Sequence, residues 1–292
     1  MVTLYRRMPK MDYVKPGSLN ELLDLLKRNR NGKYRVYAGG TDVLPKLKSR
    51  VMKTPEVLVD LKGVPDLDGI DVDVRKGIRI GALATVRSVE SSAIIKERIP
   101  ILSQAAGSIA SIQIRNRGTI AGNICNAVPS ADSAPALLCL DAQLICAGTG
   151  GEHPIAIGEF FKGPNLNALR PDEVLKEIRI PKVPEESRSV YLKLSPRSRM
   201  DLAVVGVGVL LTRTGGAFHN VRIALGAVAP TPVRALKAEA RLEGAEANDR
   251  IIAEAAQIAS EEARPIDDHR ASAEYRKMMV EVLVKRAIHQ CL

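Results

Sequence analysis

The 292-residue chain contains no tryptophan, and aromatic residues make up only 3% of it. Surfaces that bind nucleic acids usually combine basic residues with exposed aromatic ones, and no stretch of this sequence does so. The formal net charge of +10 comes from lysines and arginines spread along the whole chain, which is typical of attraction to acidic ligands or partners. The sequence therefore argues against nucleic acid as the ligand.

Cysteine is also scarce. The four cysteines, Cys125, Cys139, Cys146 and Cys291, form no C-x-x-C pair, and their spacing fits neither a zinc site nor an iron–sulfur cluster. No apolar run has the length of a transmembrane helix, and the N-terminal residues have no apolar stretch long enough for a signal peptide. We expect a soluble, cytoplasmic protein with no metal site and no membrane span.

Hydrophobic residues make up 46% of the chain, enough for two cores at this length. A capping box at Ser18-Leu19-Asn20-Glu21 predicts a helix with leucines at helical spacing, and an Asn-Gly turn within 27–33 ends it. Strands are predicted at 34–37, 57–59, 78–80, 142–147 and 174–180. Helices are predicted at 86–110, with a break near Pro100, and at 134–138.

A polar segment at 181–189, with two prolines and four charged residues, is typical of a domain boundary. After it, strands are predicted at 190–194, 203–212 and 221–228, followed by helices at 235–242 with 250–263, and at 272–289. Strands followed by helices predict an α+β unit whose helices cover one face of a sheet. We therefore expect an α+β fold with domains at 1–183 and 184–292.

Two glycine-bearing segments, eighty residues apart and each predicted to form a turn, carry the best functional signal: Ala38-Gly39-Gly40-Thr41-Asp42 and Thr119-Ile120-Ala121-Gly122-Asn123. Glycines allow close backbone approach, and successive N–H groups can form a concave nest for an anion. A Gly-Gly pair after a strand is more often a tight connection, and the first segment has neither the Rossmann nor the Walker A pattern. Two such segments together suggest a ligand with a long polar spine, such as the diphosphate of a dinucleotide. Thr41 or Asp42 can also cap a helix with Pro45 in its first turn.

Over essentially all its residues the chain resembles the flavin-binding (medium) subunit of molybdenum hydroxylases, the carbon monoxide dehydrogenase and xanthine dehydrogenase group. Four ordered motifs carry the resemblance: the two segments above, Ala-Leu-Gly-Ala-Val-Ala-Pro-Thr-Pro-Val-Arg at 224–234, and Ala-Ser-Ala-Glu-Tyr-Arg at 271–276. Ala121 stands where many relatives have glycine, and a methyl group fits there if φ is negative. The resemblance implies a PCMH-type (vanillyl-alcohol-oxidase-like) FAD-binding domain with subdomains at about 1–55 and 56–183. It also implies a C-terminal domain of the CO dehydrogenase flavoprotein type at 184–292.

The resemblance implies FAD as the cofactor, extended between the domains with its isoalloxazine towards the C-terminal one. The first segment, with its neighbours, would cradle the diphosphate, and the second would hold the other side of it. Asp132 would contact the polar part of the dinucleotide, Ile109 and Leu175 would line it, and Lys193 would lie near the isoalloxazine, with Tyr191 beside it. The implied cofactor-binding residues are Val36, Tyr37, Ala38, Gly39, Gly40, Thr41, Asp42, Val43, Ile109, Thr119, Ile120, Ala121, Gly122, Asn123, Asp132, Leu175, Tyr191 and Lys193. We expect Asp42 to cap the following helix, because its charge would repel a phosphate. Asp201 also matches a family aspartate.

No catalytic residue is assigned to this chain, whose histidines are isolated and whose Cys125 is expected to be a buried thiol. The resemblance implies electron transfer from a [2Fe-2S] small subunit, fed by a molybdopterin large subunit, through FAD to NAD⁺, a quinone or another acceptor. The complex would be a dimer of heterotrimers. Family members that reduce 4-hydroxybenzoyl-CoA carry an inserted cysteine-rich loop for a [4Fe-4S] cluster. This sequence has no such loop, which argues against that substrate. Two alternatives remain open: a free-standing FAD-dependent reductase or oxidase of the same fold, and a non-catalytic basic interaction module.

Overall fold

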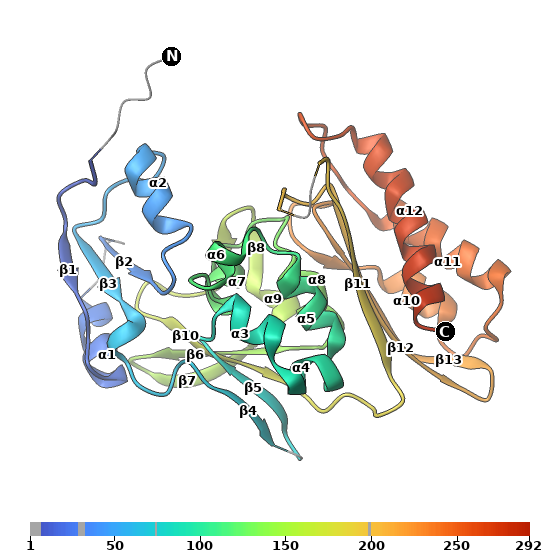
Figure 1. Cartoon of the computed structure of the whole chain (residues 1–292), viewed down its shortest axis with the longest axis horizontal. Coiled ribbons are helices and arrows are strands. Elements are labelled where there is room, and N and C mark those ends of the chain that lie inside the picture. Colours follow the sequence, from blue (N-terminus) through green and yellow to red (C-terminus); the bar gives the residue numbers. More distant parts are fainter. Residues whose placement is uncertain (1–6, 29–32, 74, 198–199) are drawn as a thin grey trace.

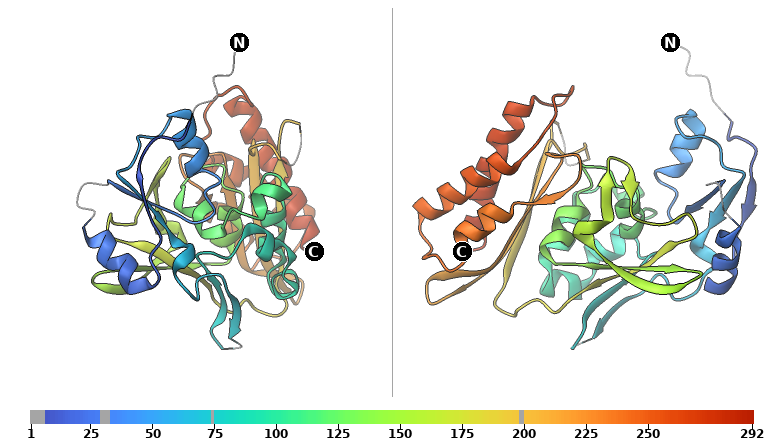
Figure 2. Two further views of the ribbon diagram at one scale, coloured as in Figure 1. Left: turned by 60° about the vertical axis from the view of Figure 1, so that its left-hand side comes forward. Right: turned by 180° about the vertical axis from the view of Figure 1, so that it is seen from behind.

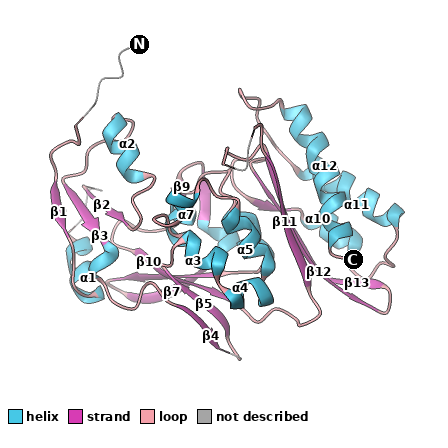
Figure 3. Cartoon of the chain, viewed as in Figure 1, coloured by secondary structure: helices cyan, strands magenta, loops and turns pink. Residues whose placement is uncertain are grey.

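The computed structural model describes residues 7–28, 33–73, 75–197 and 200–292. Three units follow one another along the chain and lie side by side in Figure 1: a small N-terminal unit, a central unit and a C-terminal unit. Each unit is a sheet with helices packed on it, as the colouring by secondary structure in Figure 3 makes plain. The predicted α+β fold is confirmed.

The N-terminal unit is built on a parallel three-stranded sheet of order β1-β3-β2. It comprises β1 (Asp12–Val14), α1 (Leu19–Lys27), β2 (Tyr34–Tyr37), α2 (Val43–Ser49), β3 (Val57–Asp60) and the 3-10 turn η1 (Leu61–Gly63). The capping box forms: Ser18 Oγ accepts from the N–H of Glu21 at 3.1 Å, and Glu21 Oε2 accepts from the N–H of Gly17 at 2.7 Å. Leucines on the inner face of α1 are buried against the sheet. The predicted Asn-Gly turn lies outside the described residues.

The central unit is built on an antiparallel sheet of order β4-β5-β10-β6-β7. Its strands are β4 (Ile70–Asp73), β5 (Gly77–Gly81), β6 (Gln143–Gly148), β7 (Gly151–Ala156) and β10 (Val174–Ile180), with a separate small hairpin of β8 (Phe161–Gly163) and β9 (Leu166–Asn167). The helices that cover one face of the sheet are α3 (Val86–Ser91), α4 (Ala93–Arg98), α5 (Pro100–Gly107), α6 (Ile112–Arg115), α7 (Ile120–Cys125), α8 (Ser133–Cys139) and α9 (Ile157–Phe160). They bury an aliphatic core of mainly Ile, Leu and Ala.

The predicted helix at 86–110 is three helices. The expected break before Pro100 is present, and Pro100 is the first residue of α5. A second break, at Ser92, was not expected: its side chain accepts a hydrogen bond from the N–H of Ile95 at 3.4 Å and so begins α4. Serine favours a helix start over a helix interior because its hydroxyl competes for backbone groups.

The C-terminal unit is an antiparallel sheet of order β11-β12-β13-β14, formed by Arg188–Leu194, Val205–Thr214, Ala217–Gly226 and Val233–Arg234. Its own helices, α10 (Leu236–Leu242), α11 (Asp249–Glu262) and α12 (Ala273–Gln290), cover one face, as expected. The other face packs on α5 and α8 of the central unit. A Cβ at Gly208 would stand 3.1 Å from the carbonyl oxygen of Pro135, and one at Gly226 would stand 2.9 Å from its ring. The sheet therefore lies between two helical layers, which fixes it against the central unit.

Among the helices of the described ranges, none is both long enough and apolar enough to cross a bilayer.

Candidate functional site

A cavity of about 730 Å³ is lined by residues of all three units. The size suits an organic cofactor, since ligand pockets usually measure about 300–1,000 Å³. All but two of the predicted cofactor-binding residues line it. The exceptions are Ile120 and Tyr191, whose side chains are buried in the core of the central unit.

The first glycine segment follows β2 directly and leads into α2. Gly40 has a φ of +74°, a left-handed conformation that glycine adopts without strain. Gly39 is needed for another reason. A Cβ there would stand 1.9 Å from the carbonyl oxygen of Arg117, two residues before the second segment. Gly39 therefore lets the two segments pack against each other, a contact that the sequence pattern did not reveal.

The backbone of this first segment suits an anion. Within the described part of the chain, the N–H groups of Gly39, Gly40, Thr41 and Asp42 have no hydrogen-bond acceptor. All four residues line the cavity. Consecutive N–H groups of this kind form a nest for phosphate or carboxylate oxygens. The residues present therefore fit the diphosphate of a dinucleotide cofactor.

The second segment is the start of a helix rather than an open turn. Thr119 is the N-cap of α7, and its Oγ1 accepts from the N–H of Gly122 at 3.0 Å. The N–H of Asn123 bonds the carbonyl of Thr119 at 3.0 Å. Ala121 lies in the first turn of this helix and is not among the positive-φ residues, so its methyl group fits. This segment offers fewer amides than a nest, but it directs the partial positive charge of a helix start towards the cavity.

Asp42 occupies the N-cap position of α2, but its side chain makes no capping hydrogen bond, so the expected capping role is wrong. Its carboxylate instead accepts from Asn126 Nδ2 at 3.1 Å and pairs with Lys46 Nζ at 2.8 Å. Lys46 also donates to Asn126 Oδ1 at 3.1 Å. Asp42 thus ties α2 to the end of α7, across the two glycine segments.

A buried polar triad lies beside the cavity, where β11 meets the segment before α8. Lys193 Nζ donates to Asp132 Oδ2 at 2.9 Å and to the carbonyl of Ser108 at 2.9 Å. The Tyr191 hydroxyl donates to the other oxygen of Asp132 at 2.7 Å. Burial raises the pKa of Asp132, and the neighbouring Lys193 and Tyr191 oppose that rise. Lys193 and Asp132 reach the cavity wall, whereas Tyr191 lies behind them and supports the carboxylate.

Two other residues from the sequence analysis also line the cavity. Burial raises the pKa of the Cys125 thiol to about 12, so this side chain is a protonated thiol and not a nucleophile. Asp201 accepts from the backbone N–H of Arg197 at 3.1 Å and from its guanidinium at 3.0 Å. Asp201 therefore helps to close the loop that brings the neighbouring Met200 and Leu202 to the cavity.

Sequence reasoning missed a large part of the lining. Most of the unpredicted residues come from the start of β2, from α6 to the segment before α8, from the stretch between the end of β9 and the start of β10, and from the loop after β11; they include Arg35, Ile114, Asn126, Asn167, Glu173, Met200 and Leu202. Asn126 lies in the stretch at 114–135 that is rich in polar and glycyl residues, and that composition was the signal for it. The others come from segments brought together by tertiary packing.

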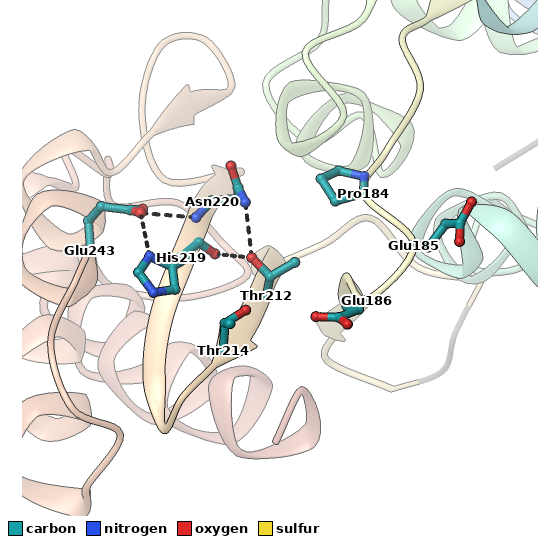
Figure 4. A pocket seen from close by; sticks show the side chains of 8 residues that line it. All are labelled: Pro184, Glu185, Glu186, Thr212, Thr214, His219, Asn220 and Glu243. Carbon is teal, nitrogen blue, oxygen red and sulfur yellow. Dashed lines mark hydrogen bonds and ion pairs between the residues drawn. The ribbon is translucent and has the colours of Figure 1, made fainter. Parts of the chain in front are cut away.

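A second recess, of about 440 Å³, lies between the linker at Pro184–Glu186 and the hairpin of β12 and β13 (Figure 4). Its polar groups largely satisfy one another. The Glu243 carboxylate accepts from the N–H groups of Asn220 and Val221 at 3.1 and 3.0 Å, and the Thr212 hydroxyl donates to the carbonyl of His219 at 2.8 Å. No cluster of three or more His, Cys, Asp or Glu suited to a metal ion occurs among the described residues. We assign no ligand to this recess.

Comparison with known proteins agrees with this geometry. A family model described as the FAD binding domain in molybdopterin dehydrogenase matches residues 9–183, and one described as the CO dehydrogenase flavoprotein C-terminal domain matches residues 190–291. The chain is 32% identical to the glyceraldehyde dehydrogenase medium chain of Sulfolobus acidocaldarius, covering 97% of this chain and 98% of that one. It is 33% identical to the carbon monoxide dehydrogenase medium chain of Hydrogenophaga pseudoflava, covering 96% of each.

The fold comparison points the same way. A solved structure of carbon monoxide dehydrogenase from Hydrogenophaga pseudoflava, in a form lacking the Mo-pyranopterin moiety of the molybdenum cofactor, superimposes with a TM-score of 0.93. The identity is 34%, over 98% of both chains. With two family models in order and full-length likeness in sequence and fold, the chain belongs to the family of FAD-binding medium subunits of molybdenum hydroxylases, the group that includes the carbon monoxide and xanthine dehydrogenases.

Proposed function

We propose that this chain is the FAD-binding subunit of a multi-subunit molybdopterin-dependent dehydrogenase in the cytoplasm. It would receive electrons from the [2Fe-2S] clusters of a small subunit, fed by a molybdopterin large subunit, and deliver them to NAD⁺, a quinone or another acceptor. The flavin, when bound, supplies the redox chemistry, and this chain supplies binding, orientation and electrostatics. We place the boundary between its FAD-binding and C-terminal domains at 183–184, and that between the two subdomains near residue 55.

The observation that carries the proposal is that both glycine segments line one cavity, with Gly39 packed on the backbone of Arg117 and Gly118 just before the second segment. The unpartnered N–H groups of Gly39, Gly40 and Thr41 would bind diphosphate oxygens, and the start of α7 would favour the same negative charge. The cavity walls restrict where the rest of the cofactor can lie. Ile109 and Leu175 line this cavity as well and would exclude water from its apolar portion.

The buried ion pair of Lys193 and Asp132 would set the electrostatics near the redox-active ring. Lys193 is almost completely buried, and a cation in such an environment stabilises nearby negative charge more strongly than it would in water. The hydrogen bonds from Tyr191 and to Ser108 fix the positions of the two charged groups. We therefore assign Lys193 the role of favouring negative charge on the reduced cofactor.

The substrate would be chosen by a different chain. Two relatives of nearly equal length are medium chains of dehydrogenases for substrates as different as glyceraldehyde and carbon monoxide, and this chain aligns with both over nearly its whole length. A subunit that bound the substrate would need a pocket that differs between such enzymes. A cofactor site can be the same in such enzymes, which supports an electron-transfer role for this chain.

Purification of the tagged chain from its own host tests the proposal. We expect a yellow complex with one FAD per chain, iron and molybdenum in fixed ratio, and two further polypeptides, assembled as a dimer of heterotrimers. A chain that binds FAD, purifies alone and itself oxidises or reduces a substrate would show the free-standing flavoenzyme instead. A colourless chain that takes up no added FAD would contradict both the electron-transfer subunit and the free-standing flavoenzyme. It would support a non-catalytic basic interaction module.

A further inference from the structure

A charged cluster lies next to the first glycine segment, and of its members only Tyr37 lines the cavity. It consists of Asp60, Lys62, Tyr13 and Tyr37. Tyr37 ends β2 and Asp60 ends β3, and the register of these parallel strands places the two residues side by side. Because the carboxyl ends of parallel strands meet at one edge of a sheet, Ala38 and Lys62, which follow them, also meet there.

Asp60 is the anchor of this cluster. Its side chain is only 2% exposed, and its carboxylate accepts four hydrogen bonds: from the Tyr13 hydroxyl at 2.6 Å, the Tyr37 hydroxyl at 3.0 Å, the backbone N–H of Lys62 at 2.9 Å and Lys62 Nζ at 2.7 Å. Burial alone would raise the pKa of Asp60, but the hydrogen bonds from Lys62 and the tyrosines outweigh it and lower the pKa. The carboxylate is therefore ionised at neutral pH and holds the ammonium group in place.

Lys62 reaches from this anchor to the glycine segment. Its ammonium group donates to the carbonyl oxygen of Ala38 at 3.0 Å and lies 4.1 Å from the centre of the Tyr37 ring. An ammonium group has three donor hydrogens and no acceptor. The Asp60 carboxylate, the Ala38 carbonyl and the face of the Tyr37 ring together fix the position of the Lys62 ammonium group.

The hydrogen bond from Lys62 to the Ala38 carbonyl also orients the N–H of the next residue, Gly39. A trans peptide is planar, so its C=O and N–H point in opposite directions. No cis peptide occurs among the described residues. A carbonyl of Ala38 held towards Lys62 therefore directs the N–H of Gly39 away from Lys62. Gly39 lines the cavity and Lys62 does not. The same bond keeps the carbonyl oxygen, which would repel a phosphate, out of the anion's path.

We propose that Lys62, anchored by Asp60, is a positioning residue for the diphosphate of the cofactor: it orients the Ala38–Gly39 peptide so that the Gly39 N–H is presented to the anion. This inference rests on the proposed diphosphate site at the first glycine segment. Lys62 does not itself line the cavity, so it acts through the peptide and not by contact with the ligand.

The test compares ligands with and without phosphate on the full-length apo chain. Dissociation constants for FAD, ADP and riboflavin would be measured for the wild type, Lys62→Met and Lys33→Met. Lys33 is the matched control, because it is a lysine of the same unit that pairs with Glu56 at 2.7 Å on the exposed surface, away from the cavity. The thermal midpoint of each apo protein would show whether it is folded.

We expect Lys62→Met to raise the dissociation constants of FAD and ADP by the same factor, about tenfold. This is the scale of one hydrogen bond to a charged acceptor. Riboflavin binding should stay within twofold, and Lys33→Met should match the wild type for all three ligands. The inference is overturned if Lys62→Met binds FAD and ADP as the wild type does, or if riboflavin weakens as much as FAD. A wild-type chain that binds no FAD would instead overturn the proposed function.

Discussion

Replacement of Gly39 by alanine should separate the two cofactor-binding segments. The added Cβ would stand 1.9 Å from the carbonyl oxygen of Arg117, 2.6 Å from its carbonyl carbon and 2.8 Å from the Cα of Gly118. Ordinary van der Waals contact begins near 3.4 Å, so the two backbones must move about 1.5 Å apart. All three neighbouring atoms belong to the backbone, so no side-chain rotation relieves the clash.

We expect the movement to fall on the first segment, because the backbone of Gly118, just before the second segment, is hydrogen-bonded on both sides within the central unit. The carbonyl of Gly118 accepts from the N–H of Val86 at 2.8 Å, and the N–H of Gly118 donates to Ile114 at 2.7 Å. A shift of about 1.5 Å takes an N–H group beyond hydrogen-bond distance of an anion that it would otherwise contact at about 2.9 Å. Overpacking of this kind costs about 1–3 kcal/mol, and each hydrogen bond lost to a charged acceptor costs about 1.5–3 kcal/mol.

Titration of the apo chain with FAD, followed by the change in flavin fluorescence, measures the effect. Gly39→Ala should raise the dissociation constant of FAD by at least tenfold and lower the free energy of unfolding by about 1–3 kcal/mol. Gly150→Ala is the matched control, because a Cβ there would meet no atom within 4 Å. If Gly39→Ala bound FAD within twofold of the wild type, the two segments would not act as one site and the reasoning would be refuted.

Further predictions concern the thiols, the acid range and the buried ion pair. Burial raises the pKa of every cysteine, to about 12 for Cys125. A thiol reagent at pH 8 should therefore modify the native chain far more slowly than the urea-unfolded chain, as measured by mass spectrometry. Fast labelling of Cys125 in the native chain would contradict this prediction. Hydrogen bonds from Arg270 lower the pKa of Asp268 from 3.8, so its ionised form contributes stability that is present above about pH 4 and lost as the pH falls further. Asp268→Asn should therefore lower the thermal midpoint at pH 7, with a difference from the wild type that shrinks below pH 4; a constant difference would contradict the assignment. Asp132→Asn and Lys193→Met should each destabilise the chain by about 3 kcal/mol in urea unfolding, and the double variant should show a coupling of about 1–3 kcal/mol. Strictly additive effects would exclude that ion pair as a stabilising contact.

The elements that the sequence predicted correctly have local causes. The capping box before α1 and the alternating residues of β2 act within a few positions, so neighbouring residues suffice to find them. The short helix α7 was read as a turn because its glycine and asparagine favour turns. Thr119 and Gly122 in fact form an N-cap pair, and Ile120 and Ile124 on the inner side of the helix are fully buried, so core packing decides the conformation.

The site was predictable where the motifs themselves form it, and less so elsewhere. The carboxylate of Asp42 was expected to cap its own helix, α2. It instead accepts a hydrogen bond from Asn126, which lies far away in the sequence. Tyr191 was expected beside Lys193 near the isoalloxazine. Both side chains reach Asp132, but only the fold shows that Tyr191 is buried behind the cavity wall. The clash that makes Gly39 necessary comes from a backbone almost eighty residues away and leaves no pattern in the sequence.

A crystal structure of the chain with FAD bound would locate the diphosphate directly. We expect it between the two glycine segments, with its oxygens at about 3 Å from the N–H groups of Gly39 to Thr41 and next to the first turn of α7. A diphosphate bound elsewhere, with those N–H groups facing solvent, would contradict this expectation.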